Sequence, residues 1–85
     1  MKVQLHKKFK KQYDKLKALQ SKTDERLVLF MKHSFDSMLN NHALKGKYQG
    51  CRSINITGDF RAVYKLIDQN TAYFLELDTH SNLYK

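Results

Sequence analysis

The stretch that decides the fold is residues 52–77, RSINITGDFRAVYKLIDQNTAYFLEL. It holds three runs rich in strand-forming residues, separated by the short turn signals TGD at 57–59 and DQN at 68–70. We therefore predict strands over 52–56, 60–67 and 71–77. Consecutive strands joined by short turns pair with their neighbours in antiparallel fashion, so these three form a meander.

The residues before this stretch predict a strand and a first helix. Val3 and Leu5 alternate with polar neighbours, which indicates a short strand. From Lys7 the apolar residues follow a helical spacing instead, and they define one face of a helix: Phe9, Tyr13, Leu16 and Leu19.

A second helix is predicted to follow a polar break at residues 21–23. Thr23 is suited to cap it, because its hydroxyl can accept a hydrogen bond from the first turn. The stripe that defines one face of this helix is Leu27, Phe30, Met31, Ser34, Phe35 and Met38. Asn40 and Asn41 mark the expected end of the helix. The tail after residue 79 is too short to predict another element.

The predicted order is strand, helix, helix and three strands, which defines a single α+β domain over residues 1–85. Because both helices precede the meander, we expect them to pack on one face of a small, twisted, mainly antiparallel sheet. The other face would be left open, or concave if the sheet twists strongly. An open face that carries arginine and aromatic side chains is a suitable platform for single-stranded RNA.

The charge of the chain points to a polyanionic partner. The net charge is +8, and it is concentrated in residues 1–22, with eight Lys and one Asp, and in residues 42–67, with five basic residues and one Asp. Cys51 is the only cysteine, so no disulfide can form within the chain, which fits a reducing cytoplasm. No apolar run approaches the length of a membrane span. We expect a cytoplasmic protein that binds nucleic acid.

Several residues between positions 42 and 84 have the chemistry needed to cut RNA without a metal. A base must take the proton of a 2′-hydroxyl, an acid must protonate the leaving 5′-oxygen, and a cation must stabilise the phosphate. Histidine serves as acid or base near neutral pH, and the arginine fork binds two phosphate oxygens. The candidates are His42, Arg52, Asp59, Arg61, His80 and Tyr84. The four histidines lack close ligand spacing, so we expect no metal site and no cofactor.

Three motifs carry a resemblance to a known family. Residues 42–46, HALKG, followed by Tyr48, Gly50 and Arg52, resemble the H-x-L-x-G…G-x-R segment of YafQ toxins. Residues 58–65, GDFRAVYK, resemble a strand motif of the wider RelE/ParE superfamily. Residues 79–84, THSNLY, resemble the T-H-x-x-L-[FY] ending of the YafQ branch. The motifs cover residues 42–85, while residues 1–41 agree only in helix pattern and basic character.

The resemblance implies both a fold and an activity. It implies two helices on a twisted antiparallel sheet, which agrees with the elements predicted above. It also implies a toxin of a type II toxin–antitoxin system, an mRNA endoribonuclease that acts in the A site of the 30S ribosomal subunit. Its expected partners are therefore mRNA, the ribosome and a cognate antitoxin protein.

The resemblance also assigns roles to individual residues. His42, Asp59 and His80 match acid–base positions of the YafQ branch, and Tyr84 matches its terminal aromatic residue. Arg61 matches a phosphate-binding arginine of the RelE branch. Asn55 stands where the YafQ branch often has a second histidine, and an amide cannot take a proton at neutral pH. The residues that we expect to bind RNA are Arg52, Phe60, Lys45, Lys47, Lys7, Lys8, Lys10 and Lys11.

Two other functions fit the same composition and fold. A ParE-like toxin would poison DNA gyrase through protein contacts without catalysis. A basic RNA- or DNA-binding module would have no toxic effect at all. The His80 and Tyr84 tail favours the ribonuclease, because a gyrase poison needs no acid–base group there.

Overall fold

The structure is a computed structural model and describes residues 1–84. Its strands are β1 (Lys2–Leu5), β2 (His42–Ala43), β3 (Arg52–Asn55), β4 (Phe60–Asp68) and β5 (Thr71–Thr79). Its α-helices are α1 (Lys7–Lys15), α2 (Gln20–Lys32) and α3 (His80–Leu83), and single 3₁₀ turns occur at Lys17–Leu19, Ser37–Leu39 and Gly46–Tyr48.

The strands form one five-stranded sheet in the order β1-β5-β4-β3-β2. All neighbouring pairs are antiparallel except β1 and β5, which run parallel. The α+β class, the N-terminal strand and the three-stranded meander are confirmed, and the observed strands begin where they were predicted to begin, within one residue. The two-residue strand β2 was not predicted, because so short a segment has no recognisable period.

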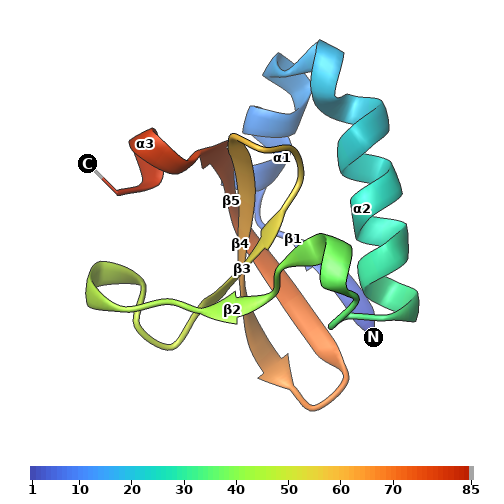
Figure 1. Cartoon of the computed structure of the whole chain (residues 1–85), viewed down its shortest axis with the longest axis vertical. Coiled ribbons are helices and arrows are strands. Elements are labelled where there is room, and N and C mark those ends of the chain that lie inside the picture. The colour runs from blue at the N-terminus through green and yellow to red at the C-terminus, as the bar shows by residue number, and fades with distance from the viewer. Residues whose placement is uncertain (85) are drawn as a thin grey trace.

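The main core lies between the sheet and the two long helices, which cover one side of it (Figure 1). Phe30 of α2 lies fully buried at its centre, with ring centroids 4.9 Å from Tyr64 and 5.2 Å from Phe74. Phe9 of α1 contacts Phe74 from the other side, at 5.8 Å. The chain has no tryptophan, and these aromatic residues, packed edge to face, are the largest side chains of the core.

The second face of the sheet is partly covered by side chains, so the prediction of an open face is wrong. Leu44, Val63 and Leu83 form a smaller buried cluster there, with Tyr48 and Cys51 packed against it. The loop 44–51 and helix α3 supply most of this cover, and they lie on the opposite side of the sheet from α2 (Figure 1). The tail thus forms a short helix that its length did not predict.

The boundaries of the second helix differ from the prediction. Thr23 is not its cap but lies fully buried within α2, which already begins at Gln20. The Nε2 of Gln20 donates a hydrogen bond to the carbonyl of Tyr13, 3.1 Å away, and this contact helps join α2 to the end of α1. The helix ends at Lys32, so Phe35 and Met38 are not part of its stripe; they lie 68% and 58% exposed.

Asn41 holds the segment between α2 and β2 against the sheet. Its Nδ2 donates to the carbonyl of Ser34 at 2.7 Å and to the hydroxyl of Tyr64 at 2.8 Å. Its Oδ1 accepts from the Nε of Arg52 at 2.8 Å. One amide therefore connects the loop, β3 and β4, and it fixes the start of β2 at the next residue, His42.

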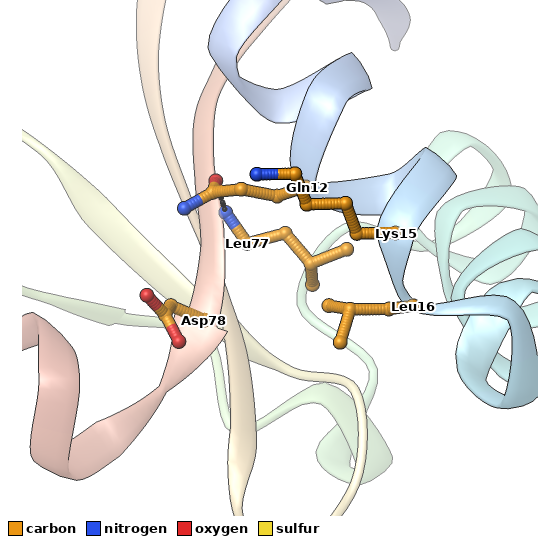
Figure 2. A pocket seen from close by; sticks show the side chains of 5 residues that line it. All are labelled: Gln12, Lys15, Leu16, Leu77 and Asp78. Atoms are coloured by element: carbon orange, nitrogen blue, oxygen red, sulfur yellow. Dashed lines mark hydrogen bonds between the residues drawn. The ribbon is translucent and has the colours of Figure 1, made fainter.

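Beyond its pairing with β1, the edge of β5 is covered by α1. The Oε1 of Gln12 accepts a hydrogen bond from the backbone N–H of Leu77 at 2.8 Å, which occupies a donor that a sheet edge would otherwise leave free. A pocket of about 120 Å³ lies at this contact, between Gln12, Lys15, Leu16, Leu77 and Asp78 (Figure 2). In residues 1–84, no helix has the length and apolar character that crossing a membrane requires.

Candidate functional site

Asp59 and His80 are brought together by the backbone. The N–H of His80 donates to the carbonyl of Asp59 at 2.9 Å, which joins the β3–β4 turn to the first residue of α3. The hydroxyl of Thr57 holds the turn by accepting from the N–H groups of Asp59 and Phe60. Both candidate side chains are exposed, so a substrate can reach them.

Arg61 lies on β4, two residues from Asp59 in sequence. Its Nη1 donates to the carbonyls of Thr57 at 3.0 Å and Gly58 at 2.9 Å, and more weakly to that of Phe60 at 3.3 Å. These bonds hold the guanidinium group against the turn. Among residues 1–84, its other N–H groups have no acceptor, so part of the fork is free to bind an anion.

Three rings form a row beside this group. The ring of His80 lies 4.8 Å from that of Tyr84, and the ring of Tyr84 lies 6.0 Å from that of Tyr48, edge to face. Burial raises the pKa of the Tyr84 hydroxyl, and the positive charge of Arg61 opposes that increase. Arg61 and Tyr84 are therefore close enough to interact electrostatically, and Tyr84 stays a neutral hydroxyl at physiological pH.

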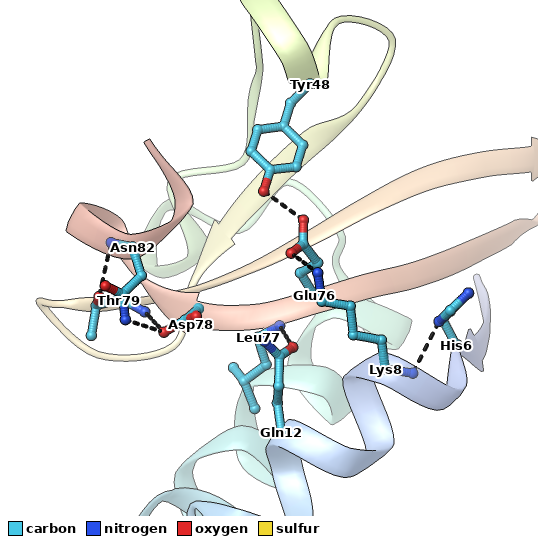
Figure 3. A network of polar contacts seen from close by, with 9 residues as sticks. All are labelled: His6, Lys8, Gln12, Tyr48, Glu76, Leu77, Asp78, Thr79 and Asn82. Atoms are coloured by element: carbon cyan, nitrogen blue, oxygen red, sulfur yellow. Dashed lines mark hydrogen bonds and ion pairs between the residues drawn. The ribbon is translucent and has the colours of Figure 1, made fainter. Parts of the chain in front are cut away.

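The carboxylate of Glu76 lies on the same face of the sheet and contacts the Tyr48 end of this row of rings. Glu76 of β5 accepts from the hydroxyl of Tyr48 at 2.5 Å and from the Nζ of Lys8 at 2.7 Å, so it connects the loop 44–51 to α1 (Figure 3). Burial by itself would raise the pKa of Glu76, but the bonds from Lys8 and Tyr48 outweigh it and hold the pKa below its usual value. Burial and the bond to Glu76 raise the pKa of Tyr48.

His42 lies on the same face but further away. The register pairs His42 with Ser53 and Ser53 with Val63, and paired residues point to the same side of a sheet. Two strand spacings, about 10 Å, separate His42 from β4. Its Nδ1 lies 2.8 Å from the carbonyl of Asn40, which can only accept, so Nδ1 carries a proton in this contact; the side chain is exposed.

Two residues expected to bind RNA point to the helix side instead. Phe60 packs against the main core, as its alternation with Arg61 requires. Arg52 pairs in register with Tyr64 of that core, and its guanidinium carbon lies 5.1 Å from the centre of the Phe35 ring. The structure therefore does not place Phe60 or Arg52 beside Arg61 and His80, and their RNA contacts stay a prediction.

Asn55 lies directly across from Arg61 in the register of β3 and β4. Its Oδ1 is buried and has no hydrogen-bond partner within residues 1–84. Asn55 thus presents an amide oxygen, unpaired within residues 1–84, on the face of the sheet that carries Arg61.

The expected basic residues fall into two groups. Lys7, Lys10 and Lys11 are exposed on α1, whereas Lys8 is tied to Glu76. Lys45 and Lys47 lie on the loop 44–51, and the Nζ of Lys47 is 5.2 Å from the centre of the Tyr48 ring. In the described part of the chain, no three His, Cys, Asp or Glu side chains gather in a way that could hold a metal ion.

Glu76 has no role in the sequence-based prediction, and Tyr48 enters it only as part of a motif. An acidic residue within a strand is typical of a solvent-facing position. Nothing in the neighbouring sequence identifies partners for Glu76, so no other role is predicted for it. Lys8 and Tyr48 come from segments 68 and 28 residues away. Only the folded chain brings these three side chains together.

Comparison with solved structures supports the same fold throughout. A copper-bound variant of a toxin from Helicobacter pylori is 33% identical, with a TM-score of 0.78 and 98% of each chain covered. The YafQ toxin of E. coli is 17% identical, with a TM-score of 0.82, covering 98% of this chain and 97% of that one. The E. coli DinJ–YafQ toxin–antitoxin complex contains a chain 18% identical, with a TM-score of 0.79, covering 98% and 96%.

No curated protein sequence matches the chain significantly. The family model for YafQ, a bacterial toxin of type II toxin–antitoxin systems, matches residues 1–85. The match spans the basic N-terminal helix as well as the three motifs between residues 42 and 85. The chain therefore belongs to the YafQ family of toxins from bacterial type II toxin–antitoxin systems.

Proposed function

We propose that this toxin is a ribosome-dependent endoribonuclease that cuts mRNA through the 2′-hydroxyl, without a metal ion, in the cytoplasm. The observation that carries the proposal is the grouping of Asp59, Arg61 and His80 at one end of the sheet. The backbone bond between Asp59 and His80 and the anchoring of Arg61 on the same turn hold three complementary groups near each other. The basic surface supports an RNA substrate.

In this mechanism His80 is the acid that protonates the leaving 5′-oxygen. Asp59 is the nearer candidate for the base that takes the 2′-hydroxyl proton, and the exposed His42 is the more distant one. Arg61 binds the scissile phosphate with the part of its fork that the turn does not use, and it stabilises the added negative charge. Tyr84 packs beside His80 and limits the ring's freedom.

Primer extension on a reporter mRNA, in cells and in a purified translation reaction, tests this assignment. Wild type should cut the message within ribosome-bound codons, and His80→Ala should lose about 10²–10⁴ in rate, as expected for loss of one acid–base group. His33→Ala is the matched control, because His33 is exposed and lies beside Phe35 and Asp36, outside the group. Intact messages with DNA damage in expressing cells would instead indicate a gyrase poison, and harmless expression would indicate a simple binding module.

We also propose that an acidic antitoxin binds this toxin and blocks the site. The net charge of +8 favours an acidic partner, and a partly disordered segment can order while it covers a large surface. The structural relative YafQ occurs in a complex with DinJ, which supports the same arrangement here. Co-expression with the neighbouring open reading frame should give a co-purifying complex that melts above the free toxin. A toxin that purifies alone and gains no stability from that neighbour would contradict the proposal.

A further inference from the structure

We propose that Tyr48 and Glu76 are positioning residues for the proposed cleavage: their hydrogen bond holds the ring of Tyr48 against Tyr84, and Tyr84 in turn orients His80. The inference rests on the proposed function, because it assigns roles within the same site. Neither residue belongs to the acid–base group itself.

The first step is that Glu76 is a costly residue to bury without partners. Its side chain is only 17% exposed, and it points to the face that carries Arg61 and Val63, as its register with Val63 shows. A carboxylate in such a place needs compensating donors. It has two, the Nζ of Lys8 and the hydroxyl of Tyr48, each on one carboxylate oxygen.

The second step is that Tyr48 depends on this bond for its place. It lies in the 3₁₀ turn Gly46–Tyr48, within a loop that packs on the sheet mainly through Leu44. The Tyr48–Glu76 bond is the side-chain hydrogen bond that attaches the loop to β5 (Figure 3). Without the hydroxyl, the ring would keep its apolar contacts but lose the anchor that sets its angle.

The third step concerns Tyr84, which directly follows the one-turn helix α3. Side-chain hydrogen bonds hold the helix itself: the Thr79 hydroxyl accepts from the N–H of Asn82, and Asp78 accepts from Asn82 Nδ2. Leu83 is its buried side chain, and Tyr84 is 40% exposed. The Tyr84 ring has two aromatic neighbours, Tyr48 and His80. The orientation of the Tyr84 ring therefore follows that of the Tyr48 ring, and the His80 ring packs against the Tyr84 ring.

The bond stays intact over the pH range in which a histidine acid works. The lowered pKa of Glu76 keeps the carboxylate charged, and the raised pKa of Tyr48 keeps its hydroxyl protonated. The Tyr48–Glu76 pair is therefore a fixed support that does not add its own titration to the pH dependence of cleavage.

Tyr48→Phe tests the inference, with Tyr13→Phe as the matched control. Tyr13 also donates its hydroxyl to a carboxylate, that of Asp24 at 2.7 Å, but this bond joins α1 to α2 away from the site. Three quantities are measured for each variant: the single-turnover cleavage rate on programmed ribosomes, the Kd for those ribosomes, and the aromatic NMR shifts of His80 and Tyr84.

Tyr48→Phe should lower the single-turnover rate about tenfold, because small misplacements of a reacting group are costly. Its Kd should stay within about twofold of wild type, and the ring shifts of His80 and Tyr84 should move. Tyr13→Phe should change none of the three. Glu76→Ala should lower the rate to a similar extent, and the double variant Tyr48→Phe/Glu76→Ala should be no slower than the slower single variant, as residues acting through one bond are not additive.

A Tyr48→Phe rate within about twofold of wild type overturns the inference, and so does a lower rate accounted for by a weaker Kd. Rate losses that add in the double variant, or unmoved ring shifts, also overturn it. Failure of the proposed function is distinguishable, because wild type itself would then leave ribosome-bound messages uncut.

Discussion

Replacing Asn41 by alanine should destabilise the domain more than any nearby surface change. The asparagine side chain bonds to the Ser34 carbonyl, the Tyr64 hydroxyl and the Arg52 guanidinium, and Tyr64 is only 2% exposed. Alanine at this position leaves all three groups without their partner. Because Tyr64 is buried and its hydroxyl loses this partner, the loss is mainly the cost of an unsatisfied buried group.

The magnitude follows from counting those groups. A buried polar group left unpaired costs about 1–3 kcal/mol. The buried Tyr64 hydroxyl takes this full range and the half-buried Ser34 carbonyl its lower end, about 1 kcal/mol, so the loss is about 2–4 kcal/mol. Arg52 is half-buried and recovers solvent, so it adds little. For a domain of this size, each kcal/mol lowers Tm by about 4–8 °C. The expected fall in Tm is therefore roughly 8–32 °C.

Thermal unfolding followed by circular dichroism, with urea titration at 25 °C, measures the effect. Asn41→Asp should lose less, because a carboxylate still accepts from Arg52 while the donor to Ser34 is lost. Asn70→Ala, in the exposed β4–β5 turn, is the control and should stay within about 0.5 kcal/mol of wild type. If Asn41→Ala unfolds at the same Tm and urea midpoint as Asn70→Ala, the amide does not hold the loop and the reasoning fails.

Three further predictions concern the site and its surroundings. Arg61→Lys should slow cleavage at least about tenfold in primer extension. An ammonium cannot reproduce a fork that is anchored on one nitrogen and, in the proposed mechanism, binds phosphate with the others. Full activity of the lysine variant would reduce Arg61 to a general positive charge. The pKa of the Glu76 carboxylate is lowered in the folded state, so this group stabilises the fold above its unfolded pKa, and that stability is lost as pH falls. In urea titrations between about pH 6 and pH 3, the free energy of unfolding of Glu76→Gln should therefore fall less than that of wild type. Parallel plots of unfolding free energy against pH for the two proteins would contradict this. Replacing Lys7, Lys10 and Lys11 by Gln should weaken ribosome binding and reduce its salt dependence without altering codon preference; a changed preference would mean that α1 contacts the message.

Local sequence patterns are sufficient to predict the meander and the β1 strand. Turn signals such as Thr57-Gly58-Asp59 and the unbroken strand-forming run after Phe60 act over a few residues, so their outcome depends little on the rest of the chain. The family motifs are equally local, and they single out Asp59, Arg61 and His80 by residue type and spacing. Whether each performs its assigned chemistry stays a prediction.

Helix boundaries are less predictable, because an apolar stripe can continue past the end of its helix. Phe35 and Met38 have helical spacing relative to Leu27, yet the chain leaves the helix at His33, and Phe35 lies against Arg52. Asp36 caps a separate 3₁₀ turn by accepting from the N–H of Met38. The interaction that competes for Phe35 comes from β3, further along the chain, and no local window contains it.

The sequence alone determined the α+β class, the order of the strands in the meander, the basic character of the surface and the family to which the chain belongs, because each is encoded in short patterns or summed charge. The tertiary structure alone decided how the second face is covered and which side chains meet there. Lys8 and Tyr48 lie far from Glu76 in the chain, and both donate to its carboxylate only because the sheet brings α1, β5 and the loop 44–51 to one place. Phe60 and Arg61 are adjacent in sequence yet separated by the sheet, because successive side chains of a strand point to opposite faces.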